Sequence, residues 1–526
     1  MGKEPIHIIR QTKKGLAIML VLAVVCELLF FPTMPNFFGC AMAIISYCVF
    51  SFFFQDKYIR LFPFSFCMYL SIFMYRYLPL IATILEGKPI TFGFERPYQT
   101  FIYEIVLFLV SSLAFYFACA TPRRTDRNNI IQKSLYQLRF YEITPAIVWG
   151  IGLIGFLIRL YNFSAGDVEY GDVGGKFLSG LDYLMYAPLC LFFPTLLNLN
   201  YANKKSVWIY AICIFMINIA SNSRQSIITP IAILAILFLL YLVINNLKIT
   251  DYISGPKIVL LGLFLVFVLN LLSNVSVAML HTRKIRSDVN KLELFQRTME
   301  TMQDEALMGR LKADKDKAEG NQFISYHQGW TEQYVDNFML ARYANMRITD
   351  QTLYYAEKKG YANRQMQEVF KQNVLALFPT PLLSVLGIYV DKSKLEFSRG
   401  DLLYGSGFGG YRVTSHLADG LATFGLWYFP IQFVALFIVF KLLNCFVFSS
   451  VKGYLYAPFA LMNVFSFLGM FRNAQGIFND FAYILRGFIQ GVITYLIIFY
   501  LVRSTLKLIN VKYVKNLDIS CKVKYF

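Results

Sequence analysis

The stretch FPTPLL (378–383), continued by GDLLYGSGFGGYR (400–412) and SHLADGLATFG (415–425), separates a long polar segment from the apolar run that follows it. It opens with two prolines, passes through a glycine-dense turn and ends where the apolar run begins. We expect the chemistry of the chain to be concentrated here, with membrane-embedded helices on either side. The ionisable candidates in it are Arg412, His416 and Asp419.

The composition is that of a polytopic membrane protein. Of the 526 residues, 57% are hydrophobic and 16% are charged, whereas soluble proteins carry about a quarter charged residues. The net charge of +18 is typical of basic cytoplasmic loops, and no soluble basic domain is present, so nucleic acid is excluded as a partner. The nine cysteines form no CxxC pair, which argues against a zinc site or a disulfide framework.

Long apolar runs predict an all-α fold of about twelve transmembrane helices, because one span needs about 20 mostly apolar residues. Basic loops such as TPRRTDRNNIIQK (121–133) alternate along the chain with loops that hold few Lys or Arg. By the positive-inside rule, both termini are expected in the cytoplasm. The expected spans are 15–35, 37–54, 61–85, 101–120, 143–163, 181–199, 206–221, 226–245, 257–279, 421–446, 454–471 and 480–502.

This topology divides the chain into three parts. Residues 1–279 form an N-terminal membrane region of about nine spans, and residues 421–526 form a C-terminal region of about three spans with a basic cytoplasmic tail. Residues 280–420 form one large, mainly helical loop outside the membrane. Two prolines interrupt its last apolar segment, so we expect a re-entrant segment near 374–390 rather than a thirteenth span.

Arginines at the outer ends of spans are candidate anion ligands. Arg224 lies in SNSRQS directly before one span, Arg412 precedes another, and Arg472 follows a third. If they converge, they suit a phosphate, because the planar guanidinium bonds two oxygens and keeps its charge. The alternative is that each arginine extends separately into the lipid headgroups.

A second cluster is Ser415, His416 and Asp419. On a helix, His416 and Asp419 share a face, and either could take a proton from a hydroxyl group. The alternative is a helix N-cap with an acidic first turn. The glycines of GSGFGG (405–410) lack the strand and βαβ unit of a dinucleotide site, and the histidines are too scattered to predict a metal site.

Several of these segments resemble the Wzy-type oligosaccharide repeat-unit polymerases of bacterial envelopes, which share a membrane architecture with the O-antigen ligases. SNSRQSIITPIAIL (221–234) is similar to the family's Arg element that opens a span. FMLARYANMRITDQTLY (338–354) is similar to its loop region with Arg342 and Asp350. In FPTPLL, Thr380 stands where an Arg is often found, and Arg399 could replace that cation.

SHLADGLATFG carries the strongest resemblance. Ser415, Asp419 and Gly425 match the family pattern in register, with Asp in place of Glu. The ligase relatives carry a His near this position, and His416 fits that pattern as well, so the choice of base between His416 and Asp419 stays open. Ala235 stands where the family's loop signature after Arg224 would have Gly.

The resemblance implies a GT-C-like, metal-independent glycosyltransferase without a cofactor, in the bacterial inner membrane. It would transfer a growing glycan from undecaprenyl pyrophosphate onto a lipid-linked repeat unit, with membrane lipids around it and a chain-length regulator as a candidate partner. Asp419, His416 and Arg224 would be catalytic. The expected substrate-binding residues are Arg412, Arg472, Arg342 and Asp350. The alternatives are an O-antigen ligase and a lipid-linked oligosaccharide flippase.

Overall fold

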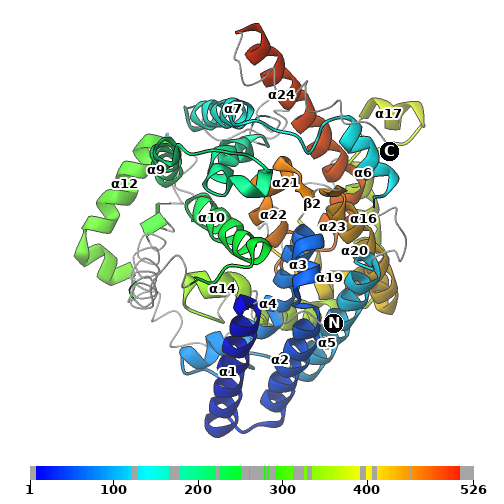
Figure 1. The fold of residues 1–526 in the computed structure, drawn as a ribbon. Helices are drawn as coiled ribbons and strands as arrows, with labels where there is room; N and C mark the ends of the chain where they lie inside the picture. The colour runs from blue at the N-terminus through cyan, green and yellow to red at the C-terminus, as the bar shows by residue number, and fades with distance from the viewer. Residues whose placement is uncertain are drawn as a thin grey trace, which may run out of the picture. The chain divides into compact units, whose positions relative to one another are not determined.

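In its described residues the chain is helical apart from one short β-hairpin, and several of the helices are long and apolar enough to cross a membrane (Figure 1). It divides into two units. Unit 1 comprises Met1–Thr121, Ala318–Asn444 and Phe467–Gln490, and unit 2 comprises Pro122–Lys317, Cys445–Ser466 and Gly491–Phe526. The computed structural model describes residues 7–120, 128–164, 178, 180–220, 224–249, 260, 278–279, 281–282, 291–311, 325–327, 334–378, 380–390, 398–405, 412–450 and 453–509.

Long apolar helices form the membrane part of unit 1. Prolines stand in the first turn of several of them, where the missing N–H costs no hydrogen bond. Stacked aromatic rings fill the space between the helices, as in the Phe50–Phe73 pair, whose centroids lie 4.0 Å apart. α2 packs against α1, α4 and α5, and α20 packs against α5. These helices are α1(His7–Phe30), α2(Met34–Phe53), α4(Pro63–Leu85), α5(Pro97–Ala118) and α20(Tyr428–Asn444), with the short α3(Asp56–Leu61) between α2 and α4.

Shorter helices of unit 1 come from the long polar segment. α15 packs on α19 and α14 packs on α4, so the segment is anchored to the membrane helices. Ser398 caps α18 by accepting from the N–H of Asp401, and Gly405 ends it with a left-handed backbone. These helices are α14(Phe338–Ala344), α15(Arg347–Lys359), α16(Arg364–Leu375), α17(Thr380–Val385), α18(Arg399–Tyr404) and α19(His416–Phe424), which the turn η6(Gly425–Trp427) joins to α20.

The predicted re-entrant segment near 374–390 contains the end of α16 and the short α17. Apolar side chains at the end of α17 and beyond it are exposed, with Val385 83% and Tyr389 84% accessible. Its insertion into a membrane interface stays a prediction. Pro379 and most of GSGFGG lie outside the described residues.

Unit 2 is arranged around a 3-10 helix, η1(Asp182–Phe192), which contacts several neighbouring helices. α7 approaches η1 so closely that a Cβ on Gly155 would lie 2.1 Å from the backbone nitrogen of Met185, so only glycine fits there. The hairpin pairs Val447 with Tyr456. The elements of this unit are α6(Ile130–Gln137), α7(Pro145–Ser164), η1, η2(Pro194–Leu197), α9(Lys204–Ala220), α10(Arg224–Asn245), α12(Lys291–Gln303), β1(Val447–Ser450), β2(Gly453–Tyr456) and α21(Pro458–Met462).

The last four elements follow α21, and the first and the last of them contain residues of both units. They are α22(Val464–Leu468), α23(Phe478–Ala482), the π-helix η7(Tyr483–Gly487) and α24(Phe488–Leu508). The π-helix continues α23 directly into α24. It therefore belongs to a single long apolar helix, Phe478–Leu508.

Seven helices in the described part of the chain are long and apolar enough to cross a membrane. They coincide with seven of the twelve expected spans. Two further expected spans are wrong as continuous helices. Residues 181–199 form η1 and η2 instead, because prolines at 188 and 194 remove backbone donors. Residues 454–471 contain strand β2 and two five-residue helices, α21 and α22.

The other three expected spans have different outcomes. Residues 15–35 lie largely in α1, and residues 206–221 in the 17-residue α9; neither helix is among the seven. Residues 257–279 lie almost entirely outside the described residues.

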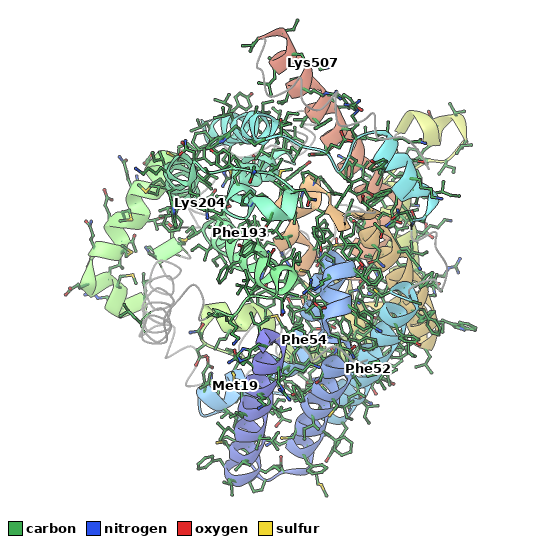
Figure 2. The ribbon with its side chains drawn as sticks, in the orientation of Figure 1. Met19, Phe52, Phe54, Phe193, Lys204 and Lys507 are labelled. Carbon is green, nitrogen blue, oxygen red and sulfur yellow. The ribbon has the colours of Figure 1, made fainter. Side chains whose placement is uncertain are left out.

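Large apolar side chains are exposed along the outer surface of the membrane helices, as Met19 on α1 and Phe52 on α2 illustrate (Figure 2). Such a surface suits contact with lipid.

Candidate functional site

The candidate site lies in unit 1, around the segment between α22 and α23. Within it, the Phe471 ring packs 4.8 Å from the imidazole of His416. The backbone carbonyl of Asn473 accepts a 2.9 Å hydrogen bond from the N–H of His416. The hydroxyl of Ser415 caps α19 by accepting from the N–H of Ala418. The start of α19 is thus held against this segment at two points.

His416 belongs to a buried polar cluster. Its Nε2 lies 3.0 Å from Oδ2 of Asp480, and its Nδ1 lies 2.8 Å from the Tyr428 hydroxyl. Gln432 donates a second hydrogen bond of 2.7 Å to the same Oδ2. A carboxylate only accepts, so Nε2 carries the proton and Nδ1 accepts from Tyr428. Both imidazole nitrogens are therefore occupied within the protein.

Asp480 keeps one carboxylate oxygen available. Oδ2 receives both hydrogen bonds described above, and no described residue donates to Oδ1. The residue is only 2% exposed, yet it lines a cavity of about 330 Å³. Oδ1 is therefore available to accept a hydrogen bond from a ligand in that cavity.

Asp419 lies on the same helix turn as His416 but faces another partner. Its two oxygens accept from Nε of Arg399 at 2.8 and 3.0 Å, and the N–H of Ile477 donates to Oδ2 at 3.1 Å. Asp419 is fully buried, and Arg399 is 9% exposed. A Cβ on Gly476 would lie 2.5 Å from Oδ2. Asp419 thus has no oxygen open to a ligand, and it joins α18, α19 and the 469–477 segment.

Two of the predicted arginines lie close to one another. Arg472 is half-buried and Arg342, on α14, is exposed. Burial and the neighbouring Arg342 charge lower the pKa of the Arg472 guanidinium. In the described part of unit 1, neither guanidinium forms an ion pair or a hydrogen bond. The nearby hydroxyl of Tyr75 donates to the Arg342 carbonyl at 3.1 Å. Two like charges without a counter-charge form a candidate anion site.

Asp350 occupies a structural position. Its carboxylate accepts from the N–H groups of Glu95 and Arg96 and from the hydroxyls of Thr100 and Tyr326, at 2.7 to 2.9 Å. Burial raises its pKa to about 6 despite these four donors. Each oxygen receives two hydrogen bonds, so the carboxylate holds the loop before α5 and has no free acceptor.

The other two predicted arginines are not part of this pair. Arg412 lies beside α18, where its N–H donates to Asp401 at 3.3 Å and its carbonyl accepts from Ser398. Arg224 is the first residue of α10 in unit 2, and its side chain lies outside the described part. Convergence of Arg224 and Arg412 with Arg472 therefore stays a prediction.

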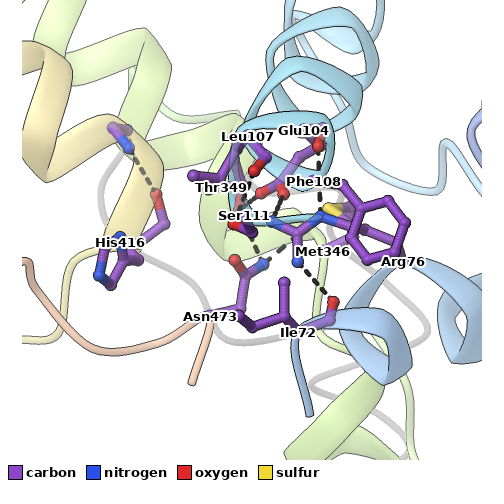
Figure 3. A network of polar contacts seen from close by, with 12 residues as sticks. Ile72, Arg76, Glu104, Leu107, Phe108, Ser111, Met346, Thr349, His416 and Asn473 are labelled. Atoms are coloured by element: carbon purple, nitrogen blue, oxygen red, sulfur yellow. Dashed lines mark hydrogen bonds and ion pairs between the residues drawn. The ribbon is translucent and has the colours of Figure 1, made fainter. Parts of the chain in front are cut away.

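A buried network connects two membrane helices to this segment (Figure 3). Arg76 on α4 and Glu104 on α5 are both fully buried and form an ion pair at 2.5 Å. Glu104 accepts from the hydroxyl of Thr349 at 3.0 Å, and that hydroxyl accepts from the Asn473 side chain at 2.8 Å. The Arg76 guanidinium also lies 5.5 Å from the Phe471 ring. The network fixes the segment that carries Arg472.

Sequence reasoning missed Asp480 and the Arg76–Glu104 pair. Asp480 stood where a short loop meets the expected span 480–502, with no recognised motif, 64 residues from His416. Arg76 and Glu104 stood inside two apolar runs, and a charged residue in a span is itself a signal of a functional or structural site. Among the described residues, no three His, Cys, Asp or Glu side chains are placed to hold a metal ion, and the metal-independent reaction stays a prediction.

Comparison with known proteins adds no identification. No protein-family model matches this sequence, and no curated protein or solved structure is significantly similar to it. The class of protein that the fold defines is a helical membrane protein.

Proposed function

We propose that the chain is a glycosyltransferase that polymerises lipid-linked oligosaccharide repeat units. One observation carries the proposal. Residues 472–480 carry two candidate groups. Arg472 has no counter-charge among the described residues, and Asp480 lies on a cavity wall with one carboxylate oxygen to which no described residue donates. His416 connects the two, because it packs on Phe471 and bonds to Asp480.

The proposed reaction uses these groups in distinct roles. An acceptor sugar hydroxyl attacks the anomeric carbon of the donor glycan, and its proton passes to Oδ1 of Asp480. The new C–O bond forms as the bond from the anomeric carbon to the lipid pyrophosphate breaks, and the electron pair leaves with the pyrophosphate. Arg342 and Arg472 stabilise the charge that develops on this leaving group. The products are an extended lipid-linked glycan and free undecaprenyl pyrophosphate.

His416 has a positioning role in this scheme. Its nitrogens are both engaged and its side chain is buried, so it orients the Asp480 carboxylate rather than touching substrate. Asp419 likewise has a positioning role. It accepts from Arg399 on α18 and from the N–H of Ile477, and so holds α19 against the 469–477 segment. The choice of base between His416 and Asp419 is thus replaced by Asp480 in the proposal.

The finer features of the architecture belong to the same proposal. They are a GT-C-like fold of about twelve spans, both termini in the cytoplasm, the bacterial inner membrane as location, and residues 280–420 on the outer face. The basic loops and the resemblance in SHLADGLATFG support them.

The decisive experiment supplies the purified chain in proteoliposomes with undecaprenyl-pyrophosphate-linked repeat units. A ladder of glycan lengths is expected from the wild type, and its loss in Asp480→Asn and Arg472→Ala. Transfer of the glycan to a different, non-homologous acceptor would instead indicate a ligase. Movement of the lipid across the bilayer without any new glycosidic bond would indicate a flippase and overturn the proposal.

A further inference from the structure

We propose that the cavity beside Asp480 is a binding site for a neutral sugar, the acceptor of the reaction. Its volume of about 330 Å³ lies at the lower end of the range for ligand sites, about 300–1,000 Å³. That size suits a sugar ring. The polar residues on its wall are Gln475, Asn479, Asp480, Tyr483, Arg486 and Gln490.

Two unsatisfied acceptors on the wall point to a ligand that donates hydrogen bonds. Oε1 of Gln475 is buried and has no partner among the described residues. Oδ1 of Asp480 has none either, while its Oδ2 is held by His416 and Gln432. A buried amide oxygen without a partner, such as Oε1 of Gln475, is rare in folded proteins. Sugar hydroxyls would satisfy both, because each can donate and accept.

Donors on the same wall complete the pattern. Asn479 contributes an amide with no described partner. Arg486 uses Nε to donate to Gln490 at 2.8 Å, which leaves its terminal nitrogens without a described partner. Its positive charge is matched by the negative charge of Asp480 on the same wall. The wall thus combines paired charges and amides with the apolar residues Leu377, Met470 and Ala482. Such a lining suits a neutral sugar ring, which has hydroxyl groups at its edge and apolar C–H faces, more than a phosphate.

The backbone also supports a built site. The π-helix Tyr483–Gly487 supplies three of the lining residues, including Arg486. Such wide turns inside α-helices are frequent at functional sites. Neither Arg342 nor Arg472 lines the cavity, so the sugar site and the candidate phosphate site are separate. Because the proton acceptor of the proposed reaction is on the cavity wall, the occupant is the sugar that loses a proton.

The assignment of the bound sugar as the acceptor rests on the proposed function, but sugar binding does not. The test is saturation-transfer difference NMR on the full chain in detergent, with the methyl glycosides of glucose, galactose, mannose and N-acetylglucosamine as probes. At least one glycoside is expected to receive saturation from the wild type. Binding should weaken about three- to tenfold in Gln475→Ala and in Asn479→Ala, the range for one lost hydrogen bond.

Arg472→Ala is the matched control, because it removes the candidate phosphate site and leaves the cavity intact. It should bind the glycoside as the wild type does, and inorganic pyrophosphate should not compete. The inference is overturned if none of the four glycosides binds, if both cavity variants bind as the wild type does, or if pyrophosphate displaces the sugar. Glycoside binding together with no glycan ladder would reject the proposed polymerase and leave the sugar site standing.

Discussion

The imidazole Nε2 of His416 lies 3.0 Å from Oδ2 of Asp480, and Asp480 lines a cavity. No described residue donates to the other carboxylate oxygen of Asp480. This relationship gives the two residues different roles although they form one pair. His416 is enclosed by protein on both sides of its ring. Of the two residues, only Asp480 has a side-chain atom that is available to a ligand. His416 therefore orients the carboxylate, and Asp480 contacts the ligand.

Replacement of Asp480 by Asn tests the assignment of Asp480 as the residue that contacts the ligand and accepts the proton. Loss of a general base typically slows a reaction about 10²- to 10⁴-fold, and we expect a fall of this size in the rate of ladder formation. Asp304→Asn, at an exposed carboxylate on another segment, serves as the control and should keep the wild-type rate. An Asp480→Asn variant that is folded and fully active would exclude Asp480 as the base.

Replacement of Arg472 or Arg342 by Ala tests the candidate phosphate site. Removal of one preorganised charge from a leaving group should lower kcat about 10²- to 10³-fold. Arg364→Ala provides the matched control, since Arg364 is an exposed arginine at the start of α16 in the same unit. The initial rate of ladder formation, measured over a series of donor concentrations, gives kcat and KM. Equal rates for all three variants would contradict a role in catalysis.

Asp419→Asn should act on stability rather than on chemistry. The change leaves the Arg399 charge buried and unpaired, and breaking one half of a buried ion pair costs about 3–5 kcal/mol. Thermal unfolding should show a lower Tm, and the double variant Arg399→Met with Asp419→Leu should recover much of the loss. A variant with unchanged Tm and no turnover would instead place Asp419 in the reaction.

The Arg76–Glu104 pair can be tested by a double-mutant cycle. Arg76→Met and Glu104→Gln should each destabilise the protein, because each leaves the other charge buried between two apolar helices. The double variant should be less destabilised than the sum of the two, with a coupling of about 0.5–3 kcal/mol. Additive changes in Tm would show that the two side chains do not interact.

Asp350 predicts a pH dependence of stability. Burial raises its pKa from 3.8 to about 6, so the folded state holds the proton more tightly than the unfolded chain does. Its contribution to stability is therefore complete below pH 3.8 and is lost as the pH rises through about 6. The Tm difference between wild type and Asp350→Asn should be larger at about pH 4 than at about pH 7. A difference that grows with rising pH would contradict the assignment.

Part of this organisation was predictable from sequence. Apolar runs and positive-inside loops predicted a helical membrane protein, and each of the seven candidate spans overlaps a predicted one. The predicted span at residues 181–199 was wrong because apolar composition does not distinguish a membrane-spanning α-helix from a buried 3-10 helix such as η1. The prolines at 188 and 194 make that distinction, because proline has no N–H with which to continue an α-helical hydrogen-bond pattern.

The candidate site was predictable in its charges but not in its partners. The proposed pairing of Arg342 with a substrate anion came from its segment, and its closeness to Arg472 fits that prediction. The contacts of His416 and Asp419 could not be derived from spacing, because Asp480 and Arg399 reach them through tertiary packing. A shared helix face specifies neighbours along one turn, and it does not specify which other element covers that turn.

The π-helix Tyr483–Gly487 forms part of the cavity wall, so the shape of the cavity depends on the number of residues in this helix. A π-turn holds one residue more than an α-turn, and one residue corresponds to about 100° of rotation in an α-helix. Deletion of a single residue here would turn Arg486 and Gln490 toward another direction while α23 and Asp480 stayed in place. The range of sugars accepted by such a site can therefore diverge through insertions and deletions, without any substitution in the residues that perform the chemistry.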